Sequence, residues 1–219
     1  MSLTVKSKVE VPELIELRRG QIIPAAIELF GKRGYHDTAI RDIAKRANIS
    51  IGTIYQYVTD KEDVLFLALV EVLDSYLRRI PAALEGLTEP LQRFRSAVAA
   101  YCAVNDENTA ATVLAYRETA SLRKARRNLI KQKEIETNKL IAACIEDCIA
   151  TGLFRKVDIE LFTYQIVMFC HAWALKGWRF RKLMSLQGYV EGGLELMLNQ
   201  VLTLRGKRKL ARIRSAPRN

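Results

Sequence analysis

The sequence is short of several features that define other classes of protein. Four cysteines in 219 residues are too few for a disulfide framework, and this usage favours a reducing compartment. No apolar run reaches the roughly 18 residues that a membrane-spanning helix needs. The most apolar stretch, residues 64–72, is interrupted by Glu71, and residues 1–6 lack the apolar core of a secretory signal. We therefore expect a globular protein of the cytoplasm.

Signatures of enzymes and metal sites are also missing. There is no glycine-rich phosphate loop, no GxSxG elbow and no HExxH motif, and the two histidines, His36 and His171, fall in different predicted domains. Cys144 and Cys148 share a helix face at spacing i, i+4, but no nearby histidine or cysteine completes a tetrahedral set. The other two cysteines are typical of core positions. We predict no catalytic residues, no metal and no cofactor.

Positive charge is present but unevenly distributed. Residues 1–62 carry 10 basic and 8 acidic residues (+2), residues 63–204 carry 18 and 16 (+2), and residues 205–219 carry seven basic residues and no acid (+7), which together give the net charge of +11. The composition of residues 205–219 predicts a disordered basic tail. Such a tail attracts phosphates without specificity or simply aids solubility, so the overall charge does not by itself indicate DNA binding.

Apolar residues recur with the 3.6-residue period of an α-helix in nearly every segment, and no convincing alternating strand is present. The sequence therefore predicts an all-α protein. Pro81 is expected to end the fourth helix, Thr88 to cap the fifth, and Pro24 either to lie in the first turn of a helix that starts near Gln21 or to kink it. The predicted helices cover residues 12–32, 39–46, 50–57, 61–80, 88–104, 108–121, 123–151, 158–182 and 186–204.

Helix length changes near residue 60. The preceding helices are short and punctuated, whereas the following ones are long, as in a bundle. We expect an extension over residues 1–19, a three-helix unit over 20–62, a larger helical domain over 63–204 and the basic tail over 205–219.

Residues 38–57, TAIRDIAKRANISIGTIYQY, have the spacing of a DNA-reading helix-turn-helix. Thr38 can cap the first helix and Ser50 the second. Ala44 is small enough for the helices to cross tightly, and Asn48 is the non-glycine residue best suited to a left-handed turn. Ile49 fills the angle between the helices.

With its flanks, this segment resembles the N-terminal domain of the TetR/AcrR family of transcriptional repressors. The family pattern has glycine in place of Asn48, phenylalanine in place of Val58 and often a basic residue in place of Ile51. The resemblance extends over residues 20–65 and rests on Ala25-Ala26, Leu29-Phe30, Gly34-Tyr35, Thr38, Ile43-Ala44, Ala47, Ser50, Gly52-Thr53, Tyr55, Tyr57 and Lys61-Glu62.

Geometry and the resemblance together imply roles in DNA binding. Hydroxyls and one ammonium group, on Thr38, Ser50, Tyr57 and Lys61, are candidates for phosphate contact. Gly52 permits close approach to the groove, and Ile51 suits a thymine methyl. The expected base readers are Thr53, Tyr55 and Gln56, of which Gln56 suits adenine. The alternative for Tyr55 and Tyr57 is packing within the small domain. Arg41, Lys45 and Arg46 could touch phosphates, but such residues are more often a solvated face.

The two last predicted helices, 158–182 and 186–204, are rich in apolar residues. Gly192-Gly193 permits close backbone approach in the second. They suit a four-helix seam between two subunits, as the resemblance also implies, and a two-fold homodimer presents two recognition helices to a palindromic operator. The alternative is a monomer in which these helices form an ordinary core.

The helical domain is expected to enclose an inducer pocket. For each lining candidate taken alone, core packing is the simpler interpretation. The candidates are Phe94, Tyr101, Tyr116, Arg117, Met168, His171 and Trp178, with Glu118 as a further polar group.

A weaker resemblance concerns the ligand. YRETASL (116–122), GLFRKVD (152–158) and HAWALKGWRF (171–180) are similar to a TetR subgroup whose members often sense acyl-CoA thioesters. The basic run 121–133 could serve the CoA phosphates, but it could equally be a solvated face. The sequence thus predicts a DNA-binding repressor, released by a small hydrophobic inducer such as an acyl-CoA, with a multidrug-type sensor of the same family as the alternative. A helical enzyme or scaffold without DNA binding is the competing class.

Overall fold

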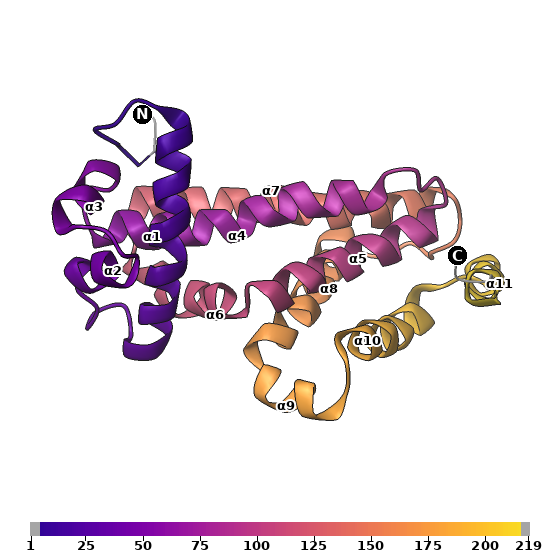
Figure 1. Ribbon diagram of the computed structural model, residues 1–219. Coiled ribbons are helices and arrows are strands. Elements are labelled where there is room, and N and C mark those ends of the chain that lie inside the picture. Colours follow the sequence, from indigo (N-terminus) through magenta and orange to yellow (C-terminus); the bar gives the residue numbers. More distant parts are fainter. Residues whose placement is uncertain (1–4, 216–219) are drawn as a thin grey trace. The chain divides into compact units, whose positions relative to one another are not determined.

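A computed structural model describes residues 5–215 of the chain, and it is helical throughout (Figure 1). These residues form eleven α-helices and one short 3-10 helix, and the sole strand-like pairing among them is an isolated bridge between Phe154 and Leu202. The all-α class predicted from periodicity is confirmed. Within the same residues, no helix is both long enough and apolar enough to cross a membrane.

The chain forms two compact units. One contains the chain up to Leu73 together with Thr109–Lys133, and the other contains Asp74–Asn108 and the chain from Glu134 onward. The division is not a single cut at residue 62, because two long helices, α4 (Lys61–Leu84) and α7 (Lys124–Ala150), each contribute to both units.

The first unit is built around α1 (Pro12–Arg33). Three helices pack against α1, namely α2 (Ile40–Arg46), α3 (Ile51–Tyr57) and α6 (Thr109–Glu118). The 3-10 helix (Thr119–Ser121) follows α6. Burial of apolar side chains holds this unit together, since each fully buried leucine, isoleucine or phenylalanine contributes roughly 1.5–3 kcal/mol. The buried side chains of the first three helices are Ile22, Ala25, Ala26, Leu29, Phe30, Ile43, Ala44, Ile54 and Tyr57.

The second unit is centred on α5 (Pro90–Glu107), which packs against α8 (Ile159–Leu175), α10 (Leu186–Val201) and α11 (Leu204–Ser215). A short helix, α9 (Gly177–Leu183), follows α8. Aromatic rings fill the interior: Phe94 meets Phe154 edge to face at 5.3 Å, and Tyr76 stacks on Tyr101 at 4.1 Å between ring centroids. Such pairs add stability beyond their buried area.

Two prolines lie inside helices where the sequence predicted ends or starts. α1 begins at Pro12, as the helix predicted over 12–32 requires, and it continues through Pro24, so of the two alternatives for Pro24 the start near Gln21 is wrong. The carbonyl that loses its partner to Pro24 belongs to Gly20, and both residues are exposed, so water can satisfy that carbonyl. α4 likewise continues three residues past the exposed Pro81 before it ends at Leu84.

Three other predicted boundaries need correction. The helix expected over 158–182 is interrupted at Lys176, where φ −116° and ψ 21° leave the helical region and α8 gives way to α9. Glu89, not Thr88, caps α5, because its carboxylate accepts the backbone N–H of Gln92 at 2.8 Å. The N-cap of α2 is Ala39, which makes no side-chain cap, rather than Thr38.

The basic tail is ordered over most of its length. Residues 204–215 form α11, so the predicted disorder is wrong for 205–215, while 216–219 lie outside the described residues. Gly206, Leu210 and Ile213, at spacing i, i+4, i+7, give this helix an inward face, on which Gly206 and Leu210 are buried. A Cβ on Gly206 would overlap the carbonyl oxygen of Leu153, which shows how closely the backbones approach.

Candidate nucleic-acid interface and ligand region

The turn between α2 and α3 has the geometry that the sequence predicted. Asn48 adopts φ 56°, and it is the one non-glycine residue with a positive φ among those described. The Ile49 amide donates to the Ala44 carbonyl at 3.0 Å, and Ala44 is buried at the helix crossing. Ser50 then caps α3 by accepting the Thr53 amide at 3.0 Å. These bonds fix the direction in which α3 leaves the turn.

One face of α3 is anchored and the other is exposed. Ile54 and Tyr57 are buried, whereas Ile51 is 52% and Tyr55 42% exposed, and Gly52 and Gln56 are exposed beside them. Thr53 is half-buried, and its hydroxyl shares a 2.8 Å hydrogen bond with that of Ser50. A short helix held by one face with aromatic and amide side chains on the other can enter a major groove.

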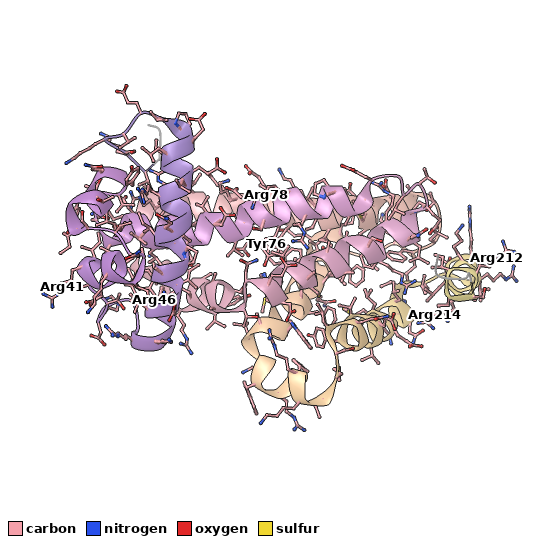
Figure 2. All side chains as sticks on the ribbon, in the orientation of Figure 1. Arg41, Arg46, Tyr76, Arg78, Arg212 and Arg214 are labelled. Atoms are coloured by element: carbon pink, nitrogen blue, oxygen red, sulfur yellow. The ribbon has the colours of Figure 1, made fainter. Side chains whose placement is uncertain are left out.

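Basic side chains flank the start of this exposed face. Arg41 and Lys45 of α2 line a hollow of about 660 Å³ together with Asn48, Ser50 and Ile51. Both basic side chains are exposed, and Arg41 points away from the body of its unit (Figure 2). Arg46 is instead paired with Glu28. Arg41 and Lys45 thus adjoin α3 directly, as the phosphate-contact alternative for these residues requires.

Three predicted phosphate contacts are engaged inside the protein. Thr38 is 1% exposed, and its hydroxyl donates to the Gly34 carbonyl at 2.7 Å. The Tyr57 side chain is buried, in line with the packing alternative. The Lys61 ammonium donates to the carbonyls of Tyr35 (2.6 Å) and His36 (3.0 Å) and lies over the Tyr35 ring. Lys61 therefore holds the loop before α2.

An ion cluster joins the first turn of α4 to the first turn of α7. Arg126 contacts Asp63 and, at 3.5 Å, Glu62, while Arg123 reaches Glu62 at 2.9 Å. Burial alone would raise the pKa of Asp63, but hydrogen bonds from the Thr59 amide and the Arg126 guanidinium outweigh it and lower the pKa. The carboxylate therefore stays charged and ties the two helices together at neutral pH.

The chain before α1 covers the end of α3, a feature that sequence reasoning missed. The Lys8 amide and the Ser7 hydroxyl donate to the Gln56 carbonyl at 2.8 and 3.1 Å, and Arg19 donates to the Tyr57 carbonyl at 3.2 Å. The last carbonyls of a helix have no partner within it. This segment, together with Arg19 of α1, supplies those partners for the exposed helix.

Three of the seven predicted ligand residues, Phe94, Tyr101 and His171, are buried in the second unit, and two of them are in contact. The Tyr101 hydroxyl is 3.2 Å from Nε2 of His171, and Tyr101 stacks on Tyr76, whose hydroxyl donates to Asn105 at 2.9 Å. Burial lowers the pKa of His171 to about 4, so the imidazole is neutral at pH 7. Tyr76, Tyr101, Asn105 and His171 thus form an uncharged polar cluster. Phe94, on the same helix α5, packs instead against Phe154 and Phe162.

The other four predicted ligand residues are at the surface. Met168 is 49% exposed on α8, and Trp178 is 71% exposed on α9. Tyr116 and Arg117 are exposed on α6, which belongs to the first unit. Periodicity could not separate Met168 from the buried residues of α8, because α8 is apolar almost all round.

Two buried polar side chains were not predicted from the sequence. Both amide atoms of Asn138 on α7, and the hydroxyl of Thr163 on α8, are buried without a hydrogen-bond partner. An unpaired buried polar atom costs about 1–3 kcal/mol. The sequence signal was a polar residue in the buried register of a long helix.

Three further features of the described residues add nothing to the candidate sites. All four cysteines are buried and free, and burial raises the pKa of Cys148 to about 12. Residues 5–215 contain no group of three histidine, cysteine or acidic side chains placed to hold a metal ion. The larger hollow, about 1100 Å³, lies on α5, α10 and α11 and includes none of the seven ligand candidates.

The helix-turn-helix with its exposed second helix, attached to a larger helical unit, defines a DNA-binding transcriptional regulator. Two family models match: "Bacterial regulatory proteins, tetR family" over residues 22–68, and "Tetracyclin repressor-like, C-terminal domain" over 87–175. The chain is 52% identical over 210 residues to the HTH-type transcriptional regulator HbdR of Aromatoleum sp. (strain CIB), covering 96% of this chain and 92% of that protein. It therefore belongs to the tetR family of bacterial regulators, which are not enzymes.

Solved structures agree on the fold. A tetR-family regulatory protein from Rhodococcus RHA1 superposes with a TM-score of 0.76 at 27% identity, covering 84% of this chain and 96% of that one. AibR, solved with isovaleryl coenzyme A and operator DNA, gives a TM-score of 0.70 at 17% identity over 84% of this chain and 98% of that one. At this identity the second likeness concerns the fold alone.

Proposed function

We propose that this regulator is a ligand-responsive repressor that binds a palindromic operator as a homodimer in the cytoplasm. The observation that carries the proposal is the exposed face of α3, on which Tyr55 and Gln56 face outward while Ile54 and Tyr57 anchor the helix. Ser50, Ile51, Gly52, Thr53, Tyr55 and Gln56 form the proposed contact set on α3, with Arg41 and Lys45 beside it. Thr38, Tyr57 and Lys61 act by holding the helix and its loop.

The DNA-binding proposal is tested with two variants of α3. Gln56→Ala and Tyr55→Ala remove exposed groups without disturbing the buried face, so both should fold like the parent. Loss of a bidentate contact to adenine by Gln56 should cost about 1–3 kcal/mol and relax sequence preference at one base pair. The measurement is fluorescence anisotropy with the DNA upstream of the protein's own gene.

Gln132→Ala, an exposed glutamine on α7, is the matched control and should bind DNA like the parent. Equal affinity of all three variants would contradict the assignment of α3 as the reading helix.

A stripe of exposed apolar side chains supports the homodimer. Leu161, Tyr164 and Met168 lie at spacing i, i+3, i+7 on α8, so they share one face, and all three are exposed in the single chain. Monomers rarely leave a large contiguous apolar patch in water. An isologous contact through this face would place two copies of α3 about a two-fold axis, as a palindromic operator requires.

The ligand is proposed to bind in the second unit at the polar cluster of Tyr76, Tyr101, Asn105 and His171. The support is chemical: the cluster is uncharged at pH 7, and Asn138 offers an unpaired buried amide in the same unit. An acyl-CoA, whose thioester carbonyl is a neutral acceptor, suits such a site, and AibR was solved with isovaleryl coenzyme A. α4 begins at Lys61, shortly after the end of α3, and continues into this unit. A shift of α4 on ligand binding would therefore alter the position of the helix-turn-helix, here called the reading head.

Calorimetric titration with medium- and long-chain acyl-CoAs tests this ligand. Heat of binding and release of operator DNA are expected, and both should weaken in Asn138→Leu, which removes the unpaired amide at similar volume. The same variant should raise the free energy of unfolding without ligand, because a buried unsatisfied group is lost. Absence of heat and of release with every acyl-CoA would favour the alternative, an uncharged or cationic drug-like inducer.

A further inference from the structure

Residues 5–10, here called the N-terminal arm, are fixed to the recognition helix. Two bonds join the arm to the Gln56 carbonyl, from the Lys8 amide (2.8 Å) and the Ser7 hydroxyl (3.1 Å). Arg19 donates to both the Val5 carbonyl (2.7 Å) and the Tyr57 carbonyl (3.2 Å), and so connects the start of the arm to the end of α3. The arm therefore moves with the reading head.

The two sides of the arm differ in exposure and charge. Val5 is buried and Ser7 and Val9 are half-buried, while Lys6, Lys8 and Glu10 are exposed. This alternation is that of an extended chain with one side against the protein and the other in solvent. Neither lysine takes part in an ion pair with any residue that the structure describes.

We propose that the N-terminal arm is a second DNA-contacting element, in which Lys6 and Lys8 bind phosphates beside the groove that α3 enters. The proposal rests on the proposed DNA-binding function of α3. Its basis is the direct bond between the Lys8 main chain and Gln56, whose side chain is exposed on the reading face. Two ammonium groups held there are positioned to neutralise the backbone of the same duplex.

The competing explanation is that the arm only caps α3. The two roles use different atoms, which makes them separable. Capping uses the Lys8 main-chain N–H and the Ser7 hydroxyl, whereas phosphate binding uses the two lysine ammonium groups. Replacing both lysines with glutamine leaves every capping bond in place and removes only the charge.

The test compares the double variant Lys6→Gln/Lys8→Gln with the parent by fluorescence anisotropy on the DNA upstream of its own gene. Affinity is measured across salt concentrations from about 50 to 200 mM, where phosphate contacts dominate the salt dependence. Each lost phosphate contact should reduce the slope of log K against log salt by about 0.9, hence by about 1.8 for each reading head. Circular dichroism melting should match the parent.

The control is Lys139→Gln/Lys156→Gln, which removes the same charge from exposed positions in the second unit and should keep the parent slope. A third variant, Ser7→Ala, should lower the melting temperature and keep the slope. If Lys6→Gln/Lys8→Gln has the same slope as the control, the proposal is wrong and the arm only caps α3. A parent chain without salt-dependent DNA binding would instead overturn the proposed function, and this inference with it.

Discussion

A buried histidine makes the free energy of unfolding depend on pH. His171 lies in the interior of the second unit, where its Nε2 faces the Tyr101 hydroxyl. Burial lowers its pKa from 6.5 to about 4. The unfolded chain therefore binds a proton between these values while the folded chain does not, and acidification in this window favours unfolding.

We predict that His171 makes the protein less stable at pH 5 than at pH 7.5 by about 2 kcal/mol, given a pKa near 6.5 in the unfolded chain. Below pH 4 both states are protonated and the loss is complete. His171→Gln should remove this part of the pH dependence, since the amide does not titrate. Urea unfolding of both proteins at the two pH values is the measurement, and an identical pH dependence in the variant would contradict the burial argument.

Single positions of the helix-turn-helix were predictable where the backbone demands a particular residue type. Asn48 in a left-handed turn and Ser50 as a cap follow from local conformation alone, and both predictions are confirmed. Thr38 and Lys61 were harder, because a hydroxyl or an ammonium is equally suited to a phosphate and to a protein carbonyl. For Tyr57 a signal existed, since it lies three residues after the buried Ile54 and shares its face.

At the scale of elements, the ion cluster between α4 and α7 holds a buried carboxylate whose charge is compensated by an arginine. The Asp63 side chain is 3% exposed and that of Arg126 is 15% exposed. The lowered pKa of Asp63 means that its contribution to stability is present at neutral pH and is lost as the pH falls below the ordinary carboxylate range.

We predict that Arg126→Leu lowers the free energy of unfolding by about 3–5 kcal/mol, because the buried Asp63 carboxylate would lose its cationic partner. The control is Arg79→Leu, which breaks the exposed pair with Glu107 and should change stability little. Urea denaturation at neutral pH compares the two. Similar values for both variants would show that the cluster is screened like a surface pair.

Helix positions followed from periodicity, while helix ends and the tail did not. The tail was misjudged because a count of seven basic residues conceals the spacing of Gly206, Leu210 and Ile213, and because docking against Leu153 is a tertiary effect. The break at Lys176 falls within a continuous apolar run, where periodicity gives no boundary. The N-terminal arm was missed since its bonds join residues 49 positions apart in the chain.

At the scale of the whole molecule, the proposed homodimer depends on the apolar stripe of α8. We predict that Leu161→Glu, which places a charge on a side chain 60% exposed in the single chain, converts the dimer to a monomer and weakens operator binding through loss of the second reading head. Multi-angle light scattering gives the mass directly. Leu17→Glu on α1, an equally exposed leucine away from α8, should remain dimeric. A dimeric Leu161→Glu variant would place the subunit contact elsewhere.

The sharing of α4 and α7 between the two units has a consequence for how the protein melts. A helix is cooperative along its length, so disordering Lys61–Leu73 in one unit frays the same rod that supports Asp74–Leu84 in the other. We therefore predict that the two units denature together. Scanning calorimetry should accordingly record one endotherm, with calorimetric and van't Hoff enthalpies in agreement, and an effector that raises the midpoint should shift the whole peak instead of splitting it.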